Sequence, residues 1–388
     1  MRNTISITVI FIACITTSCI PLISSIPSEN FPTATLTTTT FESTSSVLLS
    51  QMQKTFVVAY QDVRAEDLQE FENFGESLIK TLWFDQSTLW SIQDQQVARN
   101  ILIQGTDPGL GIRELHQKGI TGKGIKVAII DQDMVLDHPE FQGKISKYYD
   151  VDGINHHSNT GSMHGSAVTS LLVGNQIGTA PDAVVIYAAV PSWLGDAQYY
   201  ADALDWIIDE NKKLPEGEKI RVVSVSAAPS GIWSEFLRNN ETWDAAFARA
   251  MEAGILVLDC TFEHGITLAC TSDLNNPNNI ASCIPNWNPP PHSPKERINV
   301  PTSRTTATQE KNNGKITFSY QFTGNGGMSW TTPYLAGVLA MGWQLNPDLT
   351  NSQILHLLYD SAYVTESGEK ILDPTAFIKA VKLTINEK

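Results

Sequence analysis

Between Ile125 and Asp259 the chain alternates short apolar runs with helical patterns, and this alternation restricts the fold more than any other feature. Four runs have the character of strands: IKVAII, AVVIYAAV, IRVVSVS and ILVLD. They are almost entirely apolar, as expected for strands that are buried on both faces. Strands that alternate with helices form a parallel sheet covered by helices on both sides. The sequence therefore predicts an α/β fold.

Two of the helical patterns between these runs each have one apolar face. The members of each face are spaced at i, i+3, i+4, i+7 and i+8, as in an amphipathic helix. The first face consists of Tyr200, Ala203, Leu204, Ile207 and Ile208. The second face consists of Trp243, Ala246, Phe247, Ala250 and Met251, and it is followed by Gly254. Glycine is favoured just after a helix, so we expect the second helix to end there.

Three polar side chains lie where such a sheet binds ligands, at the carboxyl ends of strands and the starts of helices. Asp131 follows the first apolar run, His164 begins a helix-like run, and Ser329 lies between the strand-like KITFSYQF and the helix-like PYLAGVLAMGWQL. Serine becomes a strong nucleophile when an imidazole takes its proton, and a carboxylate fixes the tautomer of that imidazole. Free N–H groups at a helix start stabilise an oxyanion. Ser329 alone would be an ordinary helix cap. Together the three residues predict a hydrolytic triad.

Four motifs resemble those of the subtilisin-like serine proteases (subtilases, peptidase family S8). In chain order they are VAIIDQDMVLDHPEF, HGSAVTSLLVG, GTAPDAVVIYAAV and GMSWTTPYLAG, and the resemblance extends from about Gly119 to Val381. The order Asp, His, Ser along the chain is also that of subtilisin. The resemblance implies a subtilisin-like three-layer sandwich, with a mostly parallel central sheet and helices on both faces.

The resemblance also implies a function and a role for each residue. The expected activity is that of an exported serine endopeptidase that hydrolyses peptide bonds through an acyl-enzyme. Asp131 would orient His164, His164 would be the general base, and Ser329 the nucleophile. The segment SVSAAPSG is similar to the substrate-binding strand of the family, so the residues that would line the cleft and pair with an extended peptide are Ser226, Ala227 and Ala228. We expect a peptide or protein substrate and a monomeric chain.

The segment AGILVLDCTFEHG departs from the family, because Glu263 stands where the oxyanion asparagine is expected. Loss of that donor costs roughly 10²–10³ in turnover. Three interpretations stay open. A protonated Glu263 could donate through its O–H, or His264 or Asn275 could donate from a rearranged loop. Alternatively, the chain is a catalytically weak or inactive peptide-binding module with a subtilase fold at the cell surface.

We predict no cofactor and no metal ligand. Compared with family members that carry a calcium-binding loop, the stretch after His164 is shorter, so a tight calcium site is not expected. The net charge of −15 and the lack of a Lys/Arg run argue against nucleic acid as a partner. Beyond the signal region the cysteines are Cys260, Cys270 and Cys283, and the sequence does not determine which two of them pair.

The N-terminal hundred residues are expected to form three segments before a peptidase domain at 101–388. Residues 1–19 have the pattern of a signal peptide, and ITTSC resembles a lipoprotein signal that would place lipid on Cys19. The alternative is plain cleavage at a nearby small residue. Residues 20–50 form a Ser/Thr-rich linker, and residues 51–100 form a pro-segment or an N-terminal extension.

Within that extension the sequence predicts a strand over Lys54–Tyr60 and an amphipathic helix over Ala65–Trp83. A signal peptide directs the chain out of the cell. We therefore expect an extracellular or cell-surface location, with a lipid anchor as the only contact with the membrane.

Overall fold

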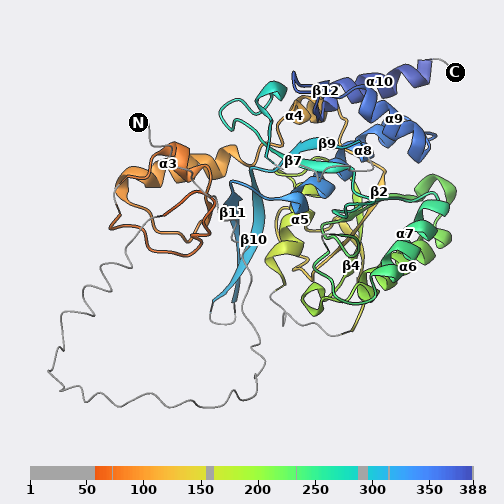
Figure 1. Cartoon of the computed structure of the whole chain (residues 1–388), viewed down its shortest axis with the longest axis horizontal. Helices are drawn as coiled ribbons and strands as arrows, with labels where there is room; N and C mark the ends of the chain where they lie inside the picture. The colour runs from red at the N-terminus through yellow and green to blue at the C-terminus, as the bar shows by residue number, and fades with distance from the viewer. Residues whose placement is uncertain are drawn as a thin grey trace, which may run out of the picture. The chain divides into compact units, whose positions relative to one another are not determined.

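A five-stranded parallel sheet forms the centre of the computed structural model, which describes residues 57–386 except 72, 154–160, 233, 287–295 and 313–314 (Figure 1). The strand order is β3-β4-β2-β5-β6. The strands are β2 (Lys126–Asp131), β3 (Ile145–Asp150), β4 (Val184–Ala189), β5 (Ile220–Val225) and β6 (Leu256–Leu258). Four of them confirm the predicted strands. The edge strand β3 is absent from the prediction because its sequence, ISKYYD, is largely polar and only partly buried.

Helices cover both faces of this sheet and complete the predicted three-layer sandwich. On β2, Val127 and Ile129 belong to one hydrophobic cluster, and Ala128 and Ile130 belong to another on the opposite face. This division follows from the two-residue period of a strand. The helices of the first cluster are α5 (Met163–Val173) and α8 (Thr331–Leu345), and those of the second are α6 (Gln198–Lys213) and α7 (Asn240–Glu252).

The predicted apolar face of α6 is confirmed, because all five of its residues are buried. On α7 the prediction is wrong for Met251, which is 37% exposed because it lies in the last turn of the helix. Gly254 has a φ of 76°, and the N–H of the next residue, Ile255, bonds to the carbonyl of Ala250. This left-handed glycine closes the helix as the sequence predicts.

Two further sheets flank the sandwich. In the first, the order is β1-β11-β10, and all pairs are antiparallel. Its strands are β1 (Trp83–Asp85), β10 (Arg304–Asn312) and β11 (Lys315–Thr323), and β11 confirms the strand predicted from KITFSYQF. The second sheet has the order β12-β13-β9-β7-β8. Its strands are β7 (Thr267–Thr271), β8 (Ile284–Pro285), β9 (Ile298–Pro301), β12 (Tyr363–Val364) and β13 (Lys370–Ile371).

The remaining helices lie at the two ends of the described chain. They are α2 (Glu76–Ile79), α3 (Ile92–Gln104), α4 (Ile112–Gln117), α9 (Asn351–Asp360) and α10 (Pro374–Asn386), with short 3-10 turns at η1 (Ser192–Leu194), η2 (Glu216–Glu218), η3 (Ile280–Ser282) and η4 (Met328–Trp330). No helix in the described ranges combines the length and the apolar character needed to cross a membrane.

The N-terminal segment differs from its predicted secondary structure. Residues 57–60 form coil and a turn rather than a strand, and the helix predicted over Ala65–Trp83 is reduced to α2. Gly75 interrupts the helix with a φ of 75°, and the preceding N–H, of Phe74, bonds to the carboxylate of Asp94. The predicted signal peptide, the linker and Cys19 lie outside the described residues.

This segment packs against β11 rather than standing apart from the rest of the chain. Phe84 of β1 contacts the rings of Trp90 and Phe322, at centroid distances of 5.2 and 5.5 Å. The compact unit begins at Val57, and α3 runs through the position where the sequence suggests the peptidase domain begins.

A disulfide resolves the choice among the cysteines. Cys270 of β7 pairs with Cys283, and Cys260 is free. Burial raises the pKa of the Cys260 thiol, and the charges of Asp259 and Asp131 raise it further. Cys260 is therefore a protonated thiol at ordinary pH.

Candidate active site

Asp131 and His164 are in direct contact at the carboxyl edge of the parallel sheet. Asp131 ends β2 and is only 2% exposed. His164 is the second residue of α5, whose cap Ser162 accepts a hydrogen bond from the His164 N–H. The Nδ1 atom of His164 lies 2.7 Å from Oδ1 of Asp131. A carboxylate at Nδ1 selects the tautomer that leaves Nε2 unprotonated and able to accept a proton.

The environment of His164 changes its basicity. Burial lowers the pKa of the imidazole, but the negative charge of Asp131 and its hydrogen bond outweigh burial, so the pKa of His164 is raised above its ordinary value. The side chain is still 24% exposed. The imidazole is therefore a stronger base than a free histidine, and solvent can reach it.

Ser329 lies in η4, between β11 and α8. Gly327, two residues before it, has a φ of 62°, which turns the chain sharply into the helix. The Ser329 hydroxyl donates to the carbonyl of Ser226 at 3.3 Å, and the Ser226 hydroxyl donates to the carbonyl of Ser329 at 2.7 Å. Within the described residues Ser329 makes no hydrogen bond to His164. The side chain of this turn that meets the imidazole is Trp330, with ring centroids 5.6 Å apart.

The predicted substrate-binding residues directly follow β5. Their backbone carbonyls already accept hydrogen bonds: that of Ser226 from Ser329, that of Ala227 from the Cys260 N–H at 2.9 Å, and that of Ala228 from the Ser234 hydroxyl at 2.8 Å. An added peptide strand would have to displace the two hydroxyl donors to use the carbonyls of Ser226 and Ala228. The sequence contains no signal for these side-chain contacts.

Glu263 is exposed in the turn that follows β6. Its carboxylate lies so close to Gly231 that a methyl group on that glycine would collide with it. The loop is held by buried Asp259, which accepts from the Trp243 indole at 3.0 Å and from the Thr261 hydroxyl at 2.8 Å. Glu263 therefore lies at the surface rather than in a buried site. That a protonated Glu263 donates to the oxyanion stays a prediction.

The other two candidate donors are engaged elsewhere. The ring of His264 stacks on Phe247 with centroids 4.0 Å apart. The amide of Asn275 donates to Glu76 at 3.3 Å and accepts from Gln104 at 2.9 Å. Each of these side chains would need to leave its present partners to reach Ser329.

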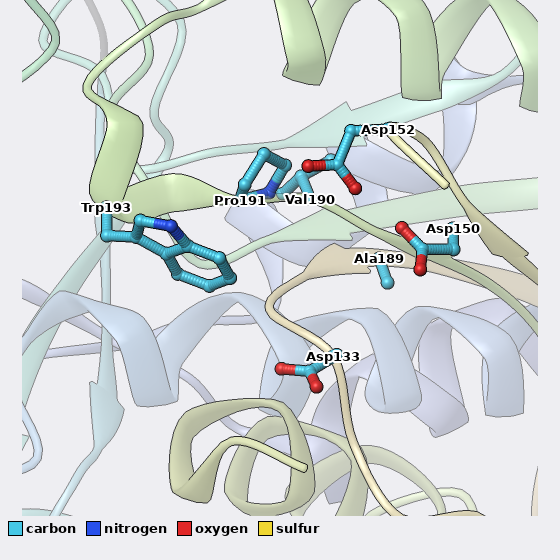
Figure 2. Close-up of a pocket in the computed structure, with 7 residues that line it drawn as sticks. All are labelled: Asp133, Asp150, Asp152, Ala189, Val190, Pro191 and Trp193. Atoms are coloured by element: carbon cyan, nitrogen blue, oxygen red, sulfur yellow. The ribbon is translucent and has the colours of Figure 1, made fainter. Parts of the chain in front are cut away.

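A small pocket lined by acidic residues lies at the same edge, two residues beyond Asp131. Figure 2 shows the carboxylates of Asp133, Asp150 and Asp152 around it, with Trp193 on another side. The pocket has a volume of about 10 Å³. Burial raises the pKa of Asp150, as do a hydrogen bond to Asp152 and the charges of Asp152 and Asp133. This group is not recognisable in the sequence, because β3, which contributes Asp150, lacks a strand pattern.

In the described part of the chain, no group of three or more His, Cys, Asp or Glu side chains is arranged to hold a metal ion. The expectation that the chain needs no cofactor or calcium ion stays a prediction.

Comparisons with known proteins agree with the fold. The family model of the subtilases (peptidase S8) matches residues 122–279. The serine protease AprX of Bacillus subtilis is 25% identical over 280 residues, covering 62% of this chain and 61% of AprX. A probable subtilase-type serine protease of Deinococcus radiodurans, DR_A0283, is 24% identical over 302 residues, covering 65% of this chain and 39% of that protein.

Solved structures share the fold. A structure of subtilase cytotoxin SubAB has a TM-score of 0.53 at 17% identity, covering 72% of this chain and 97% of that one. A protease structure from Pseudoalteromonas arctica has a TM-score of 0.51 at 17% identity, covering 71% of this chain and 95% of that one. The architecture is thus the subtilisin-like α/β sandwich. Over the regions that they cover, the sequence matches are to subtilases. The matched region spans about three fifths of AprX and two fifths of the Deinococcus protein.

Proposed function

We propose that this chain is a serine endopeptidase that acts through Asp131, His164 and Ser329. The observation that carries the proposal is the 2.7 Å hydrogen bond from His164 Nδ1 to Asp131, which leaves Nε2 free for proton transfer. Ser329 begins a helix at the same edge of the sheet, where free N–H groups favour negative charge. The match of residues 122–279 to the subtilase family model supports the same reaction class.

In the proposed reaction, Ser329 Oγ attacks the carbonyl carbon of the scissile peptide bond while His164 Nε2 takes the hydroxyl proton. The tetrahedral intermediate collapses when His164 gives that proton to the leaving amine, and an acyl-enzyme remains. Water then attacks the acyl carbon while His164 accepts a proton from the water. The bond from the acyl carbon to Ser329 Oγ breaks as His164 returns that proton to Oγ, and the carboxylic acid product leaves. For the first step, the Ser329 hydroxyl must leave the carbonyl of Ser226 and turn to His164.

We expect the turnover to be low, because Glu263 provides no evident donor for the oxyanion. Its exposed carboxylate would repel the developing negative charge, and a missing donor costs roughly 10²–10³ in kcat. The backbone N–H of Ser329, at the helix start, would remain as a donor.

A second candidate is a peptide-binding module without turnover. It is favoured by the hydrogen bond of Ser329 to Ser226, which directs the hydroxyl away from His164. Under this proposal the chain would bind extended peptides and leave them intact.

A serine-directed fluorophosphonate probe distinguishes the two functions, because it reacts only with an activated serine. We expect labelling of Ser329 in the wild type at some pH between roughly 4 and 9, and none in Ser329→Ala. His164→Ala should also lose the labelling, while Ser303→Ala should keep it. Absence of labelling across that range, together with binding of intact peptides, would leave the module as the function.

The expected N-terminal signal defines a proposed location. We propose that residues 1–19 direct export and that a lipid on Cys19 holds the chain at the cell surface through the linker at 20–50. Cys19→Ala should then move the protein from the membrane fraction to the medium. If the wild type is also found only in the medium, plain cleavage is correct.

We also propose that residues 57–100 remain in the mature protein as an extension rather than a released pro-segment. The extension supplies β1 to the edge of β11 and Phe84 to the cluster around Phe322. Buried Arg304 donates to the carbonyl of Gly105 at 3.2 Å, directly after α3. Release of the segment would uncover Phe322, so the mature chain should retain it, which mass spectrometry of the purified protein tests.

A further inference from the structure

Trp330 has an unusual set of contacts for a residue next to a nucleophile. It directly follows Ser329, is 3% exposed, and its ring lies 5.6 Å from that of His164 at an interplanar angle of 55°. The imidazole is therefore bonded to Asp131 through Nδ1 and also meets an indole carried on the nucleophile's own turn. These two contacts come from elements that are far apart in the sequence.

Gly326 leaves the space that the Trp330 indole occupies. A Cβ on Gly326 would lie 2.5 Å from the Trp330 Nε1 atom and closer still to Cδ1 and Cγ. Any side chain at residue 326 would therefore push the ring away. The φ of Gly326 is not in the left-handed region, so space rather than backbone strain requires glycine here.

Hydrogen bonding does not explain why the ring is held there. In the part of the chain that the structure describes, the buried Nε1 of Trp330 has no hydrogen-bond partner. A buried donor without a partner is unfavourable, and such a group in a native fold calls for another explanation. The Trp330 ring packs against Gly326 on one side and contacts the His164 ring on another, and these contacts account for its position.

We propose that Trp330 is a positioning residue that fixes the orientation of the His164 imidazole relative to Ser329. This inference rests on the proposed endopeptidase function. An aromatic ring near an imidazole also stabilises its protonated form, which exists in the transition state of proton transfer. Asp131 is the charged group that acts on His164 in the described structure, and Trp330 restrains the ring through a separate contact. Trp330 should therefore affect kcat rather than KM, because it contacts the general base His164 and not the substrate.

The test compares Trp330→Ala with Trp330→Phe. Trp330→Ala should lower kcat by roughly 10- to 100-fold with KM nearly unchanged, because a small misplacement of a catalytic group has effects of this size. The midpoint of the acid limb of kcat/KM should also move, because the ring that faces the imidazole changes the free energy of its protonated form relative to its neutral form. Trp330→Phe keeps an aromatic ring and should restore most of both properties. A purely structural role would not shift the pH profile.

Gly326 offers a second route that keeps the indole in the chain. Gly326→Ala should reproduce the kcat loss by displacing the ring, while Gly217→Ala, at a site with nothing within 4 Å, should not. Circular dichroism and thermal unfolding establish that each variant is folded. If Trp330→Ala does not fold, the comparison of Gly326→Ala with Gly217→Ala decides the proposal.

The inference is overturned if a folded Trp330→Ala or Gly326→Ala keeps the wild-type kcat and pH midpoint, or if Trp330→Phe is as impaired as Trp330→Ala. Fluorophosphonate labelling of the wild type separates this failure from that of the proposed function. A wild type that labels, together with unaffected variants, rejects the role of Trp330 alone. A wild type that never labels rejects the proposed endopeptidase and the role of Trp330 with it.

Discussion

His164 Nδ1 lies 2.7 Å from Asp131 Oδ1, although the two residues are 33 positions apart in the chain. The last residue of a parallel strand and the first turn of a helix bring them together at one edge of the sheet.

Asp131→Asn should lower kcat by about 10⁴-fold while leaving the fold intact, as the same change does in the trypsin triad. The amide has the shape of the carboxylate, but it favours the wrong tautomer of His164. Steady-state kinetics on a fluorogenic peptide measures the effect, with Asp137→Asn, an exposed neighbour, as the control. A loss smaller than tenfold would mean that Asp131 does not orient the base.

The pH dependence of kcat/KM should have an acid limb with its midpoint above the ordinary histidine pKa of 6.5. The general base must be neutral, and a raised pKa keeps His164 protonated up to a higher pH. Activity should therefore appear only as the pH rises through that raised pKa. A midpoint at or below 6.5 would show that Asp131 does not raise the pKa of His164 as its contact implies.

Glu263→Asn should raise kcat by roughly tenfold or more with little change in KM, because it removes an exposed carboxylate and adds an amide donor. Glu263→Ala is the matched control, since it removes the charge without adding a donor and should give a smaller gain. Single-turnover kinetics separates the chemical step from binding. A fall in kcat for Glu263→Asn would instead mean that Glu263 takes part in the reaction.

Phe84→Ala should destabilise the whole compact unit by about 3–5 kcal/mol, since it removes a fully buried ring that contacts Trp90 and Phe322. Urea unfolding followed by fluorescence should still give one transition, at lower urea. Ile92→Ala, at a site that is 93% exposed, should change the free energy of unfolding by less than about 0.5 kcal/mol. A new early transition beside an unshifted main one would indicate that the N-terminal segment folds independently.

Replacing both Cys270 and Cys283 by serine should lower the free energy of unfolding by roughly 3 kcal/mol, as expected for a loop closed over 13 residues. When the denatured wild type is alkylated before reduction, peptide mass spectrometry should find the label on Cys260 but not on Cys270 or Cys283. Alkylation of Cys270 or Cys283 without reductant would contradict the pairing.

The sequence by itself determined the parallel sheet, the apolar faces of its helices and the order of the three candidate catalytic residues. The runs ending at Asp131 and Val225 are recognisable because burial on both faces leaves a continuous apolar pattern within a single segment. Gly254 is recognisable because the end of a helix is a local requirement of the backbone. Such features depend only on residues that are close in the chain.

The tertiary structure decided what depends on contacts between distant segments. It joined Cys270 to Cys283, directed the Ser329 hydroxyl to Ser226, and placed Trp330 against His164. It also ended the helix expected after Ala65, because Phe74 bonds to Asp94 instead of continuing the turn. A pattern along one segment records whether its residues are buried, but not which side chain of another segment meets them. That partner is fixed only when the whole chain packs.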